Sequence, residues 1–399
     1  MKSNIPVTVL SGYLGSGKTT LLNHLLHNQT DWKIAVVVND MSEVNIDASM
    51  VKQGRFKRTE EKLVELQNGC ICCTLREDLI QEVEKLAAMD IDYILIESTG
   101  ISEPIPVAQS FTYEDEEPGI HLGENCRLDT MVTVVDANRF WDDYASGETL
   151  LDRQQAADET DAREVIDLLI DQIEFANVIV LNKIDLVKSS DRDELKAVLH
   201  QLNPEARIVE SEFSRVAPEE VLNTGRFDFE KVSQGAGWIK ELNEDHVPES
   251  DEYNISSFVY RSKKPFHPER LMAWLENWPS SIIRAKGFFW IASRNDIAGL
   301  LSQAGTSLSI QGAGEWIAVL PETDQQEILA EDPELLTRWD DTYGDRLTEL
   351  VFIGIEMDQK KIIETLDQCL LSEREMEEDW KTFADPLPEF TGDHPHDHS

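Results

Sequence analysis

Basic residues are scarce in this sequence. Of its 399 residues, 36 are Lys or Arg and 77 are Asp or Glu, which gives a formal net charge of −41. A surface of this sign repels nucleic acids and anionic membranes, so we expect neither as the main partner. The charge is typical of a highly soluble protein, and it does not exclude a local positive site for a phosphate.

Long apolar runs and disulfide patterns are also missing. No apolar stretch approaches the roughly 18 residues of a membrane span, and the first residues resemble a strand more than a secretory signal peptide. Three of the five cysteines fall between positions 70 and 73, which is not a disulfide framework. We therefore expect a cytoplasmic protein, with enough length for two domains.

A glycine-rich segment near the N-terminus carries the first motif. Residues 12–19 read Gly-Tyr-Leu-Gly-Ser-Gly-Lys-Thr and match G-x-x-x-x-G-K-[ST], between a strand-like run at 5–10 and helix spacing at 20–26. Glycines in this setting let backbone N–H groups surround a phosphate at a helix N-terminus. We predict that Lys18 reaches the β- and γ-phosphates and that the Thr19 hydroxyl binds Mg²⁺. The predicted nucleotide contacts of this loop are Gly12, Gly15, Ser16, Gly17, Lys18, Thr19 and Thr20; the alternative is a turn that binds nothing.

The next predicted strand, residues 33–38, ends in a polar loop that contains Asp40, Glu43 and Asp47. Loops that follow the carboxyl ends of parallel strands face the ligand crevice of a doubly wound sheet. We therefore expect these carboxylates near the nucleotide, its Mg²⁺ or another cation, in a switch segment. A solvated loop is the alternative. Residues 52–62 are polar and are predicted to form a surface excursion.

Three cysteines, Cys70, Cys72 and Cys73, stand directly before a predicted helix. A T-x-x-E capping box follows at 74–77, so the helix should begin at Leu75. A helix N-terminus favours thiolate over thiol, and thiolates suit a soft or borderline cation such as Zn²⁺. Along an extended segment Cys70 and Cys72 share a face, whereas Cys73 need not, so the site is open or is completed by a nearby acid or histidine. The alternative is the packing of small buried residues.

A further strand-like run, residues 91–97, ends at Glu97 and leads to Gly100. In P-loop enzymes this position supplies an acid that holds Mg²⁺ or its water and a glycine N–H that senses the γ-phosphate. We predict these roles for Glu97 and Gly100, with residues 102–104 as part of a second switch.

An N-K-x-D sequence, Asn182, Lys183 and Asp185, follows a strand-like run at 177–181. A carboxylate there accepts hydrogen bonds from both N1–H and the 2-amino group of guanine, whereas adenine offers no such donor pair. We predict that Asp185 selects guanine and that the stem of Lys183 lies over the base. We also expect strands at 128–135 and 206–210 and a turn at Ser211 that closes over the base.

These motifs resemble those of the CobW-type metallochaperone GTPases. The likeness rests on G-x-x-G-x-G-K-T at 12–19, G-C-I-C-C-T-L-R-E-D-L at 69–79, E-S-T-G at 97–100 and N-K-x-D at 182–185, in this order. Residues 39–47 are similar to the YciC-type branch that is made during zinc starvation. Many members read N-E-x-G-E where this chain has Asn-Asp-Met-Ser-Glu, so either Asp40 or Glu43 would be the acid near the metal.

The resemblance implies a GTPase that uses GTP and Mg²⁺ and delivers zinc to an apo-form client protein under zinc limitation. No glutamine or arginine stands out as a catalytic finger, so we expect slow turnover. The resemblance also implies catalytic roles for Lys18, Glu97 and Asp40, zinc ligands at Cys70, Cys72, Cys73 and Glu43, and Mg²⁺ ligands at Thr19 and Glu97. The alternatives are a cobalt chaperone for cobalamin synthesis, a GTP-responsive protein that sequesters or senses zinc without delivery, and a P-loop kinase of a small metabolite.

Four segments are predicted along the chain: a P-loop α/β GTPase domain with a doubly wound, mostly parallel sheet at 1–225, a linker at 226–252, a smaller α+β domain of the CobW C-terminal type at 253–375, and a mobile, acidic, His-containing tail at 376–399. The second domain should hold strands at 255–260, 282–292, 316–320 and 347–355 and helices at 268–278 and 357–371. Trp274, Trp278 and Trp290 are expected in its core, and Cys126 and Cys369 are expected to be ordinary buried cysteines. The histidines of the tail either collect zinc loosely or do nothing.

Overall fold

The computed structural model describes most of the chain. The described residues are 4–28, 32–39, 62–66, 73–112, 125–156, 161, 163–233, 236, 237, 239, 242, 253–331 and 333–390. The chain forms two compact units, Met1–Gly237 and Trp238–Ser399. Among the described helices, none is both long and apolar enough to cross a bilayer.

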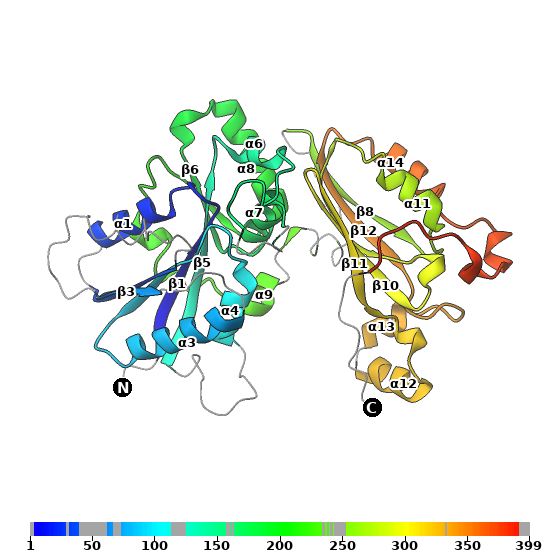
Figure 1. Ribbon diagram of the computed structural model, residues 1–399, viewed down its shortest axis with the longest axis horizontal. Helices are drawn as coiled ribbons and strands as arrows, with labels where there is room; N and C mark the ends of the chain where they lie inside the picture. The colour runs from blue at the N-terminus through cyan, green and yellow to red at the C-terminus, as the bar shows by residue number, and fades with distance from the viewer. Residues whose placement is uncertain are drawn as a thin grey trace. The chain divides into compact units, whose positions relative to one another are not determined.

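The first unit contains a seven-stranded sheet whose described strand pairs are all parallel (Figure 1). Its order is β3-β2-β4-β1-β5-β6-β7. The strands are β1 (Ile5–Ser11), β2 (Ile34–Asn39), β3 (Lys62–Leu66), β4 (Tyr93–Glu97), β5 (Cys126–Asp136), β6 (Val178–Asn182) and β7 (Arg207–Glu210). The central strands are continuous apolar runs because both faces of such a sheet are covered. The predicted fold class is confirmed.

Helices cover both faces of this sheet. Successive residues of β1 point to opposite sides: Val9 packs with α3 (Cys73–Ala87) and α4 (Pro104–Thr112), whereas Leu10 packs with α1 (Lys18–Asn28). The other helices of the first unit are α6 (Phe140–Tyr144), α7 (Val165–Glu174), α8 (Ser189–Leu202) and α9 (Phe229–Ser233). The unit is therefore a three-layer α/β/α domain.

The register of the strands brings their carboxyl ends to one edge of the sheet. Leu10 of β1 and Val38 of β2 both pair with Glu97 of β4, and Asn39 of β2 pairs with Leu66 of β3. The loop after β1, the loop after Glu97 and the chain after Leu66 therefore all leave the sheet at the same level. This edge is where a doubly wound fold binds its ligand.

The first unit continues beyond residue 225, where the sequence placed the start of a linker. Phe227 and Phe229 lie against the core of this unit, and Val232 is buried within it. Just before them, the backbone N–H groups of Thr224 and Gly225 donate to the buried carboxylate of Asp129 in β5. Burial of these side chains fixes the chain that leaves the domain.

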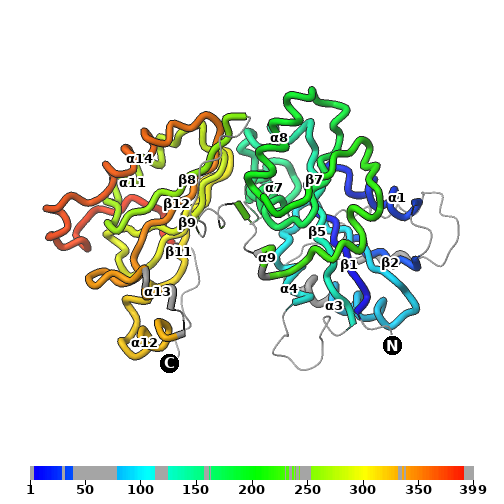
Figure 2. The backbone as a smooth tube through the Cα atoms, turned by 180° about the vertical axis from the view of Figure 1, so that it is seen from behind, coloured from blue at the N-terminus to red at the C-terminus, as the bar shows by residue number. Residues whose placement is uncertain are grey.

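The second unit is built on a five-stranded antiparallel sheet of order β11-β10-β9-β12-β8, seen from two sides in Figures 1 and 2. The strands are β8 (Ile255–Ser262), β9 (Ile282–Phe289), β10 (Ile297–Ala304), β11 (Ser307–Glu315) and β12 (Thr348–Ile355). Its helices are α11 (Pro268–Leu275), α12 (Glu322–Glu331), α13 (Pro333–Arg338) and α14 (Gln359–Asp367). Apolar side chains of α11 and α14 share a core with one face of the sheet. As predicted, Trp274 is buried in this core with Trp278 packed partly buried against it, and Trp290 is buried in a separate small cluster with Ala298 and Trp316.

Two parts of the second unit differ from the sequence prediction. Residues 316–320, predicted as a strand, contain a short 3-10 turn, Ile317–Val319, because the Asp345 carboxylate accepts the N–H groups of Ile317 and Ala318. The hairpin of β10 and β11 was not predicted at all.

Residues 375–390 pack against the second unit, although the sequence assigned residues 376–390 to a tail. Glu375 forms two hydrogen bonds with Arg270, at 2.9 and 2.8 Å. Further along, Asp385 binds the guanidinium of Arg294, which also lies 4.3 Å from the ring centre of Phe390. These contacts form a strap (residues 375–390) that closes over the domain.

Candidate functional site

The loop of residues 12–19 has a backbone that only glycine adopts without strain at three positions. Gly12, Gly15 and Gly17 have φ angles of 133°, 80° and 113°. A Cβ on Gly12 would lie 2.3 Å from the carbonyl oxygen of Val134, so the loop must sit directly against β5. This close approach holds the loop at the N-terminus of α1, where backbone N–H groups favour an anion.

The two side chains predicted to serve the phosphates and Mg²⁺ lie as expected at the start of α1. The Nζ of Lys18 donates to the carbonyl of Gly12 at 2.8 Å, so the ammonium group folds back across the loop. The hydroxyl of Thr19 donates to a carboxylate oxygen of Glu97 at 2.6 Å. A hydroxyl and a buried carboxylate in contact are a donor set that fits Mg²⁺, which binds oxygen ligands. Thr20 lies exposed in the same turn.

Gly100 is packed directly on the phosphate loop. A Cβ there would lie 2.7 Å from the backbone nitrogen of Leu14, so no other residue fits without a shift. Gln172 of α7 is buried and donates to the carbonyls of Gly100 and Ser102, at 3.4 and 3.1 Å. Gln172 was not found from the sequence; its helical spacing marks it only as a core position. The loop after Glu97 is thus held from two sides.

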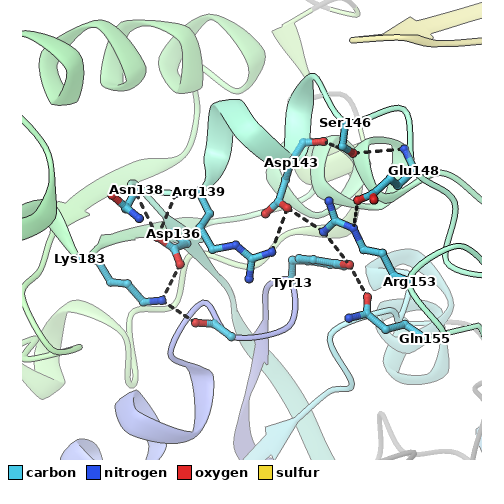
Figure 3. A network of polar contacts seen from close by, with 11 residues as sticks. Tyr13, Asp136, Asn138, Arg139, Asp143, Ser146, Glu148, Arg153, Gln155 and Lys183 are labelled. Carbon is cyan, nitrogen blue, oxygen red and sulfur yellow. Dashed lines mark hydrogen bonds and ion pairs between the residues drawn. The ribbon is translucent and has the colours of Figure 1, made fainter.

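Asn182 and Lys183 brace the phosphate loop from the side of the predicted base site. The Asn182 amide donates to the Ser16 carbonyl at 2.8 Å and accepts the N–H of Ser214 at 2.8 Å. Lys183 donates to the Gly15 carbonyl at 2.8 Å and forms an ion pair with Asp136, at 2.5 Å (Figure 3). The stem of Lys183 is therefore fixed before any base arrives. Asp136 and Ser214 were given no role by the sequence, although Asp136 ends a strand at the ligand edge.

Asp185 is exposed and makes no hydrogen bond or ion pair with any residue that the structure describes. It lies in the 3-10 turn Ile184–Leu186, directly after Lys183 in its left-handed conformation (φ 61°). Its carboxylate is therefore free to accept two hydrogen bonds from a ligand, as the sequence predicts.

A polar network that the sequence did not reveal holds Tyr13 of the phosphate loop (Figure 3). The Tyr13 hydroxyl donates to Gln155 and accepts from Arg153, which also pairs with the buried Asp143 at 2.7 Å. Arg139 reaches the same carboxylate at 3.1 Å. Burial raises the pKa of the Tyr13 phenol, so it remains a neutral donor. Segment 139–155 therefore braces the outer side of the loop.

The metal motif lies mostly outside the described residues. Asp40, Glu43, Cys70 and Cys72 belong to segments that the structure does not describe, so their arrangement remains a prediction. Cys73 is the first residue of α3, which thus begins two residues before the predicted start. Among the described residues, no cluster of three His, Cys, Asp or Glu could hold a metal ion.

The two cysteines outside the motif are poor metal ligands. Cys126 and Cys369 are buried and are not in disulfides. Burial raises the pKa of the Cys126 thiol to about 12 and that of Cys369 to about 11. Both stay protonated at neutral pH, whereas metals bind the thiolate. The expectation that they are ordinary buried cysteines is confirmed.

Comparison with known families covers most of the chain. Residues 6–210 match the CobW/HypB/UreG nucleotide-binding domain, and residues 255–370 match the C-terminal domain of the cobalamin synthesis protein CobW. These two ranges fall in the first and the second compact unit.

Three known proteins show the extent of the similarity. The zinc-regulated GTPase metalloprotein activator 1 of Dictyostelium discoideum is 45% identical over 404 residues, which cover 96% of this chain and 84% of that protein. The zinc chaperone CobW of Sinorhizobium sp is 30% identical over 301 residues, 72% of this chain and 82% of that protein. The zinc-regulated GTPase metalloprotein activator 1 of Schizosaccharomyces pombe is 30% identical over 247 residues, which cover 61% of this chain and 54% of that protein.

Proposed function

The chain belongs to the CobW/HypB/UreG family, and from this premise we propose that it is a cytoplasmic, GTP-hydrolysing zinc chaperone that hands zinc to apo-form client proteins. The relatives named as zinc-regulated GTPase metalloprotein activator and zinc chaperone support this function. The observation that carries it is the contact between Thr19 and Glu97 in a complete phosphate-loop site, together with an exposed Asp185 that has no partner among the described residues.

Each group of the nucleotide site, whether side chain or backbone, has a separate proposed role. Lys18 binds the β- and γ-phosphates, Asp185 reads the guanine edge, and the N–H of Gly100 senses the γ-phosphate. Thr19 and Glu97 hold Mg²⁺, which when bound neutralises charge on the phosphates. Asp40 is proposed to act next to them in hydrolysis. No arginine or glutamine stands out in the sequence as a catalytic finger, so we expect slow turnover, with a client completing the site.

The cargo site is proposed at Cys70 and Cys72, completed by Cys73 or Glu43. The strand register supports its closeness to the nucleotide. Leu66, the last described residue before the motif, is aligned through Asn39 and Val38 with the level of Glu97. Neighbouring strands are about 4.8 Å apart, so the chain leaves β3 roughly 10 Å from the strand that carries Glu97. Metal and nucleotide sites so close are expected to influence each other.

Zinc affinity in different nucleotide states tests this proposal. Calorimetric titration of zinc into the nucleotide-free, GDP-bound and non-hydrolysable GTP-analogue forms should give affinities that differ by roughly 5- to 150-fold, the usual range of such coupling. Cys72→Ser should weaken zinc binding and remove the nucleotide dependence, while Cys126→Ala should change neither. Equal zinc affinities in the three forms would overturn the switch, and GTP turnover unchanged by an apo client would favour sequestration or sensing over delivery.

A further inference from the structure

One large apolar side chain is exposed next to the predicted base site. Phe213 lies in the turn after β7 and exposes 62% of its surface, more than any other large apolar residue in the described part of the chain. Leu186, which is 58% exposed, follows Asp185 directly. An exposed single apolar residue is normal, but the backbone at this position is not.

Two successive residues of this turn have a left-handed backbone. Phe213 and Ser214 have φ angles of 53° and 55°. Such angles are uncommon outside glycine, and for a bulky residue they persist only where the surroundings impose them. The turn therefore holds its aromatic residue outside the core at a cost in stability.

The contacts that impose this backbone come from the nucleotide site itself. The N–H of Ser214 donates to Asn182 at 2.8 Å, and its hydroxyl donates to the carbonyl of Gly17 at 3.0 Å. On the other side of the turn, the carbonyl of Ser211 accepts the N–H of Ile184, at 3.4 Å. Phe213 thus stands between one anchor on the phosphate loop and one anchor on the N-K-x-D turn.

We propose that Phe213 is a stacking residue for the guanine base, an inference that rests on the proposed binding of GTP. The guanidinium of Arg215 lies over the ring, 5.7 Å from its centre, which leaves the other ring face for a ligand. The base edge is read by Asp185, whereas Phe213 adds a planar apolar contact on the purine face. Lys183, whose Nζ is fixed by Gly15 and Asp136, supplies a second rigid contact. The turn is preorganised, so little order is lost when the base binds.

Binding of three probes separates stacking from the other contacts. Stacking of a base on an aromatic ring typically corresponds to roughly 5- to 150-fold in affinity. Because Phe213 is largely exposed to solvent, we expect Phe213→Ala to weaken GDP binding by about 5- to 30-fold. Inosine diphosphate should lose the same factor because it presents the same purine face. Pyrophosphate, which has no base, should bind the parent and the variant equally.

Conservative and remote variants serve as controls for an indirect effect of Phe213→Ala on the fold. Phe213→Tyr should restore GDP affinity and Phe213→Leu should restore it only in part, because leucine is apolar but has no ring. Phe288→Ala, at a partly exposed site in the second unit, should leave GDP affinity unchanged. In Phe213→Trp, GDP should quench fluorescence beyond the change seen in the parent.

Two results would overturn the proposal. Equal GDP affinity of Phe213→Ala and the parent would show that the ring does not contact the base. Equal weakening of GDP and pyrophosphate would show that the ring only supports the phosphate loop. A parent protein that binds pyrophosphate but no guanine nucleotide would instead refute the proposed GTP function, so the two failures are distinct.

Discussion

Two buried carboxylates of the same sheet are used in opposite ways. Asp129 of β5 is fully buried and accepts five hydrogen bonds, from Arg127, Tyr93, Thr130 and the backbone of Thr224 and Gly225. Glu97 of β4 is equally buried, but its partner Thr19 is itself an expected ligand of the metal. The first carboxylate is held by protein donors, whereas we propose that the second exchanges the Thr19 hydroxyl for a cation.

The difference shows how to separate a structural acid from a functional one. The donors of Asp129 come from segments up to 96 residues away in sequence. Two of them, the N–H groups of Thr224 and Gly225, hold the segment that leaves the domain against the sheet. Burial, together with the charge of Asp129, raises the pKa of Tyr93, which keeps that donor protonated. Thr19, which donates to Glu97, comes from the phosphate loop, at the edge where ligands bind. Burial alone therefore does not identify function; the identity of the partners does.

The largest expected effect is a loss of stability on substitution of Asp129, the structural carboxylate. Asp129→Ala leaves several buried donors without an acceptor, and removal of one side of a buried charged network costs about 3–5 kcal/mol. Urea unfolding of the first unit should show this loss as a lower free energy of unfolding. The GTPase rate of the folded fraction should stay close to that of the parent. A change below about 1 kcal/mol would mean that the segment from Thr224 is held by other contacts.

Glu97→Gln tests the functional side. The substitution keeps the shape and a hydrogen-bond acceptor for Thr19 but removes the charge that is proposed to hold Mg²⁺. We expect a fall in kcat of about 10²- to 10³-fold, the usual effect of losing one preorganised electrostatic contact, with little change in unfolding free energy. The measurement is steady-state GTP hydrolysis at several Mg²⁺ concentrations. A large loss of stability with unchanged kcat would reverse the roles assigned to the two carboxylates.

The same contrast explains what the sequence could predict. Six strands of the first unit were found because buried parallel strands are uninterrupted apolar runs that end at recognisable loops. The strand β3 was missed because it is a short edge strand, Lys-Leu-Val-Glu-Leu, behind a charged segment. In the second unit β10 and β11 were missed because they are rich in Gly, Ser and Gln. The pairing of β10 with β9 depends on tertiary contacts: a Cβ on Gly299 of β10 would lie 2.4 Å from the ring of Phe289 in β9.

The site was predictable where chemistry follows local spacing. The phosphate loop, Glu97, Gly100 and the N-K-x-D turn are short motifs that their strands place. Partners from distant segments have no such signature. In the sequence, Gln172 of α7 is an ordinary polar residue of an amphipathic helix and Ser214 is an ordinary loop residue. Their roles become visible only in the structure, where Gln172 donates to Gly100 and Ser214 donates to Asn182. Only tertiary structure brings these together.

Asp185 sharpens the comparison because it is a carboxylate with no protein partner among the described residues. Asp185→Asn should weaken GDP binding by roughly 10- to 100-fold, because a charge-assisted pair becomes a mismatch with the 2-amino group. It should improve binding of xanthosine diphosphate, because an amide N–H can donate to the 2-oxo group of xanthine. Competition between the two nucleotides measures the reversal. Unchanged preference would show that Asp185 does not read the base.

Glu375 gives the smallest expected effect and tests whether burial sets the size of a carboxylate's contribution. It is only partly buried, yet its hydrogen bonds with Arg270 hold the pKa of the Glu375 carboxyl well below its usual range, against the effect of desolvation. An acid whose pKa is lower in the folded state stabilises the protein above its unfolded pKa, near 4.3. The contribution is lost as the pH falls through the folded value.

We therefore expect Glu375→Gln to lower the stability of the second unit by about 1 kcal/mol at pH 7, since solvent screens a partly exposed pair. The difference between parent and variant should stay constant down to about pH 5 and shrink below about pH 4. Urea unfolding across this range, with the more exposed Glu378→Gln as control, measures it. A difference that persists unchanged at the lowest pH would mean that the charge of Glu375 does not hold the strap, and that its apolar contacts at Leu387 and Phe390 do.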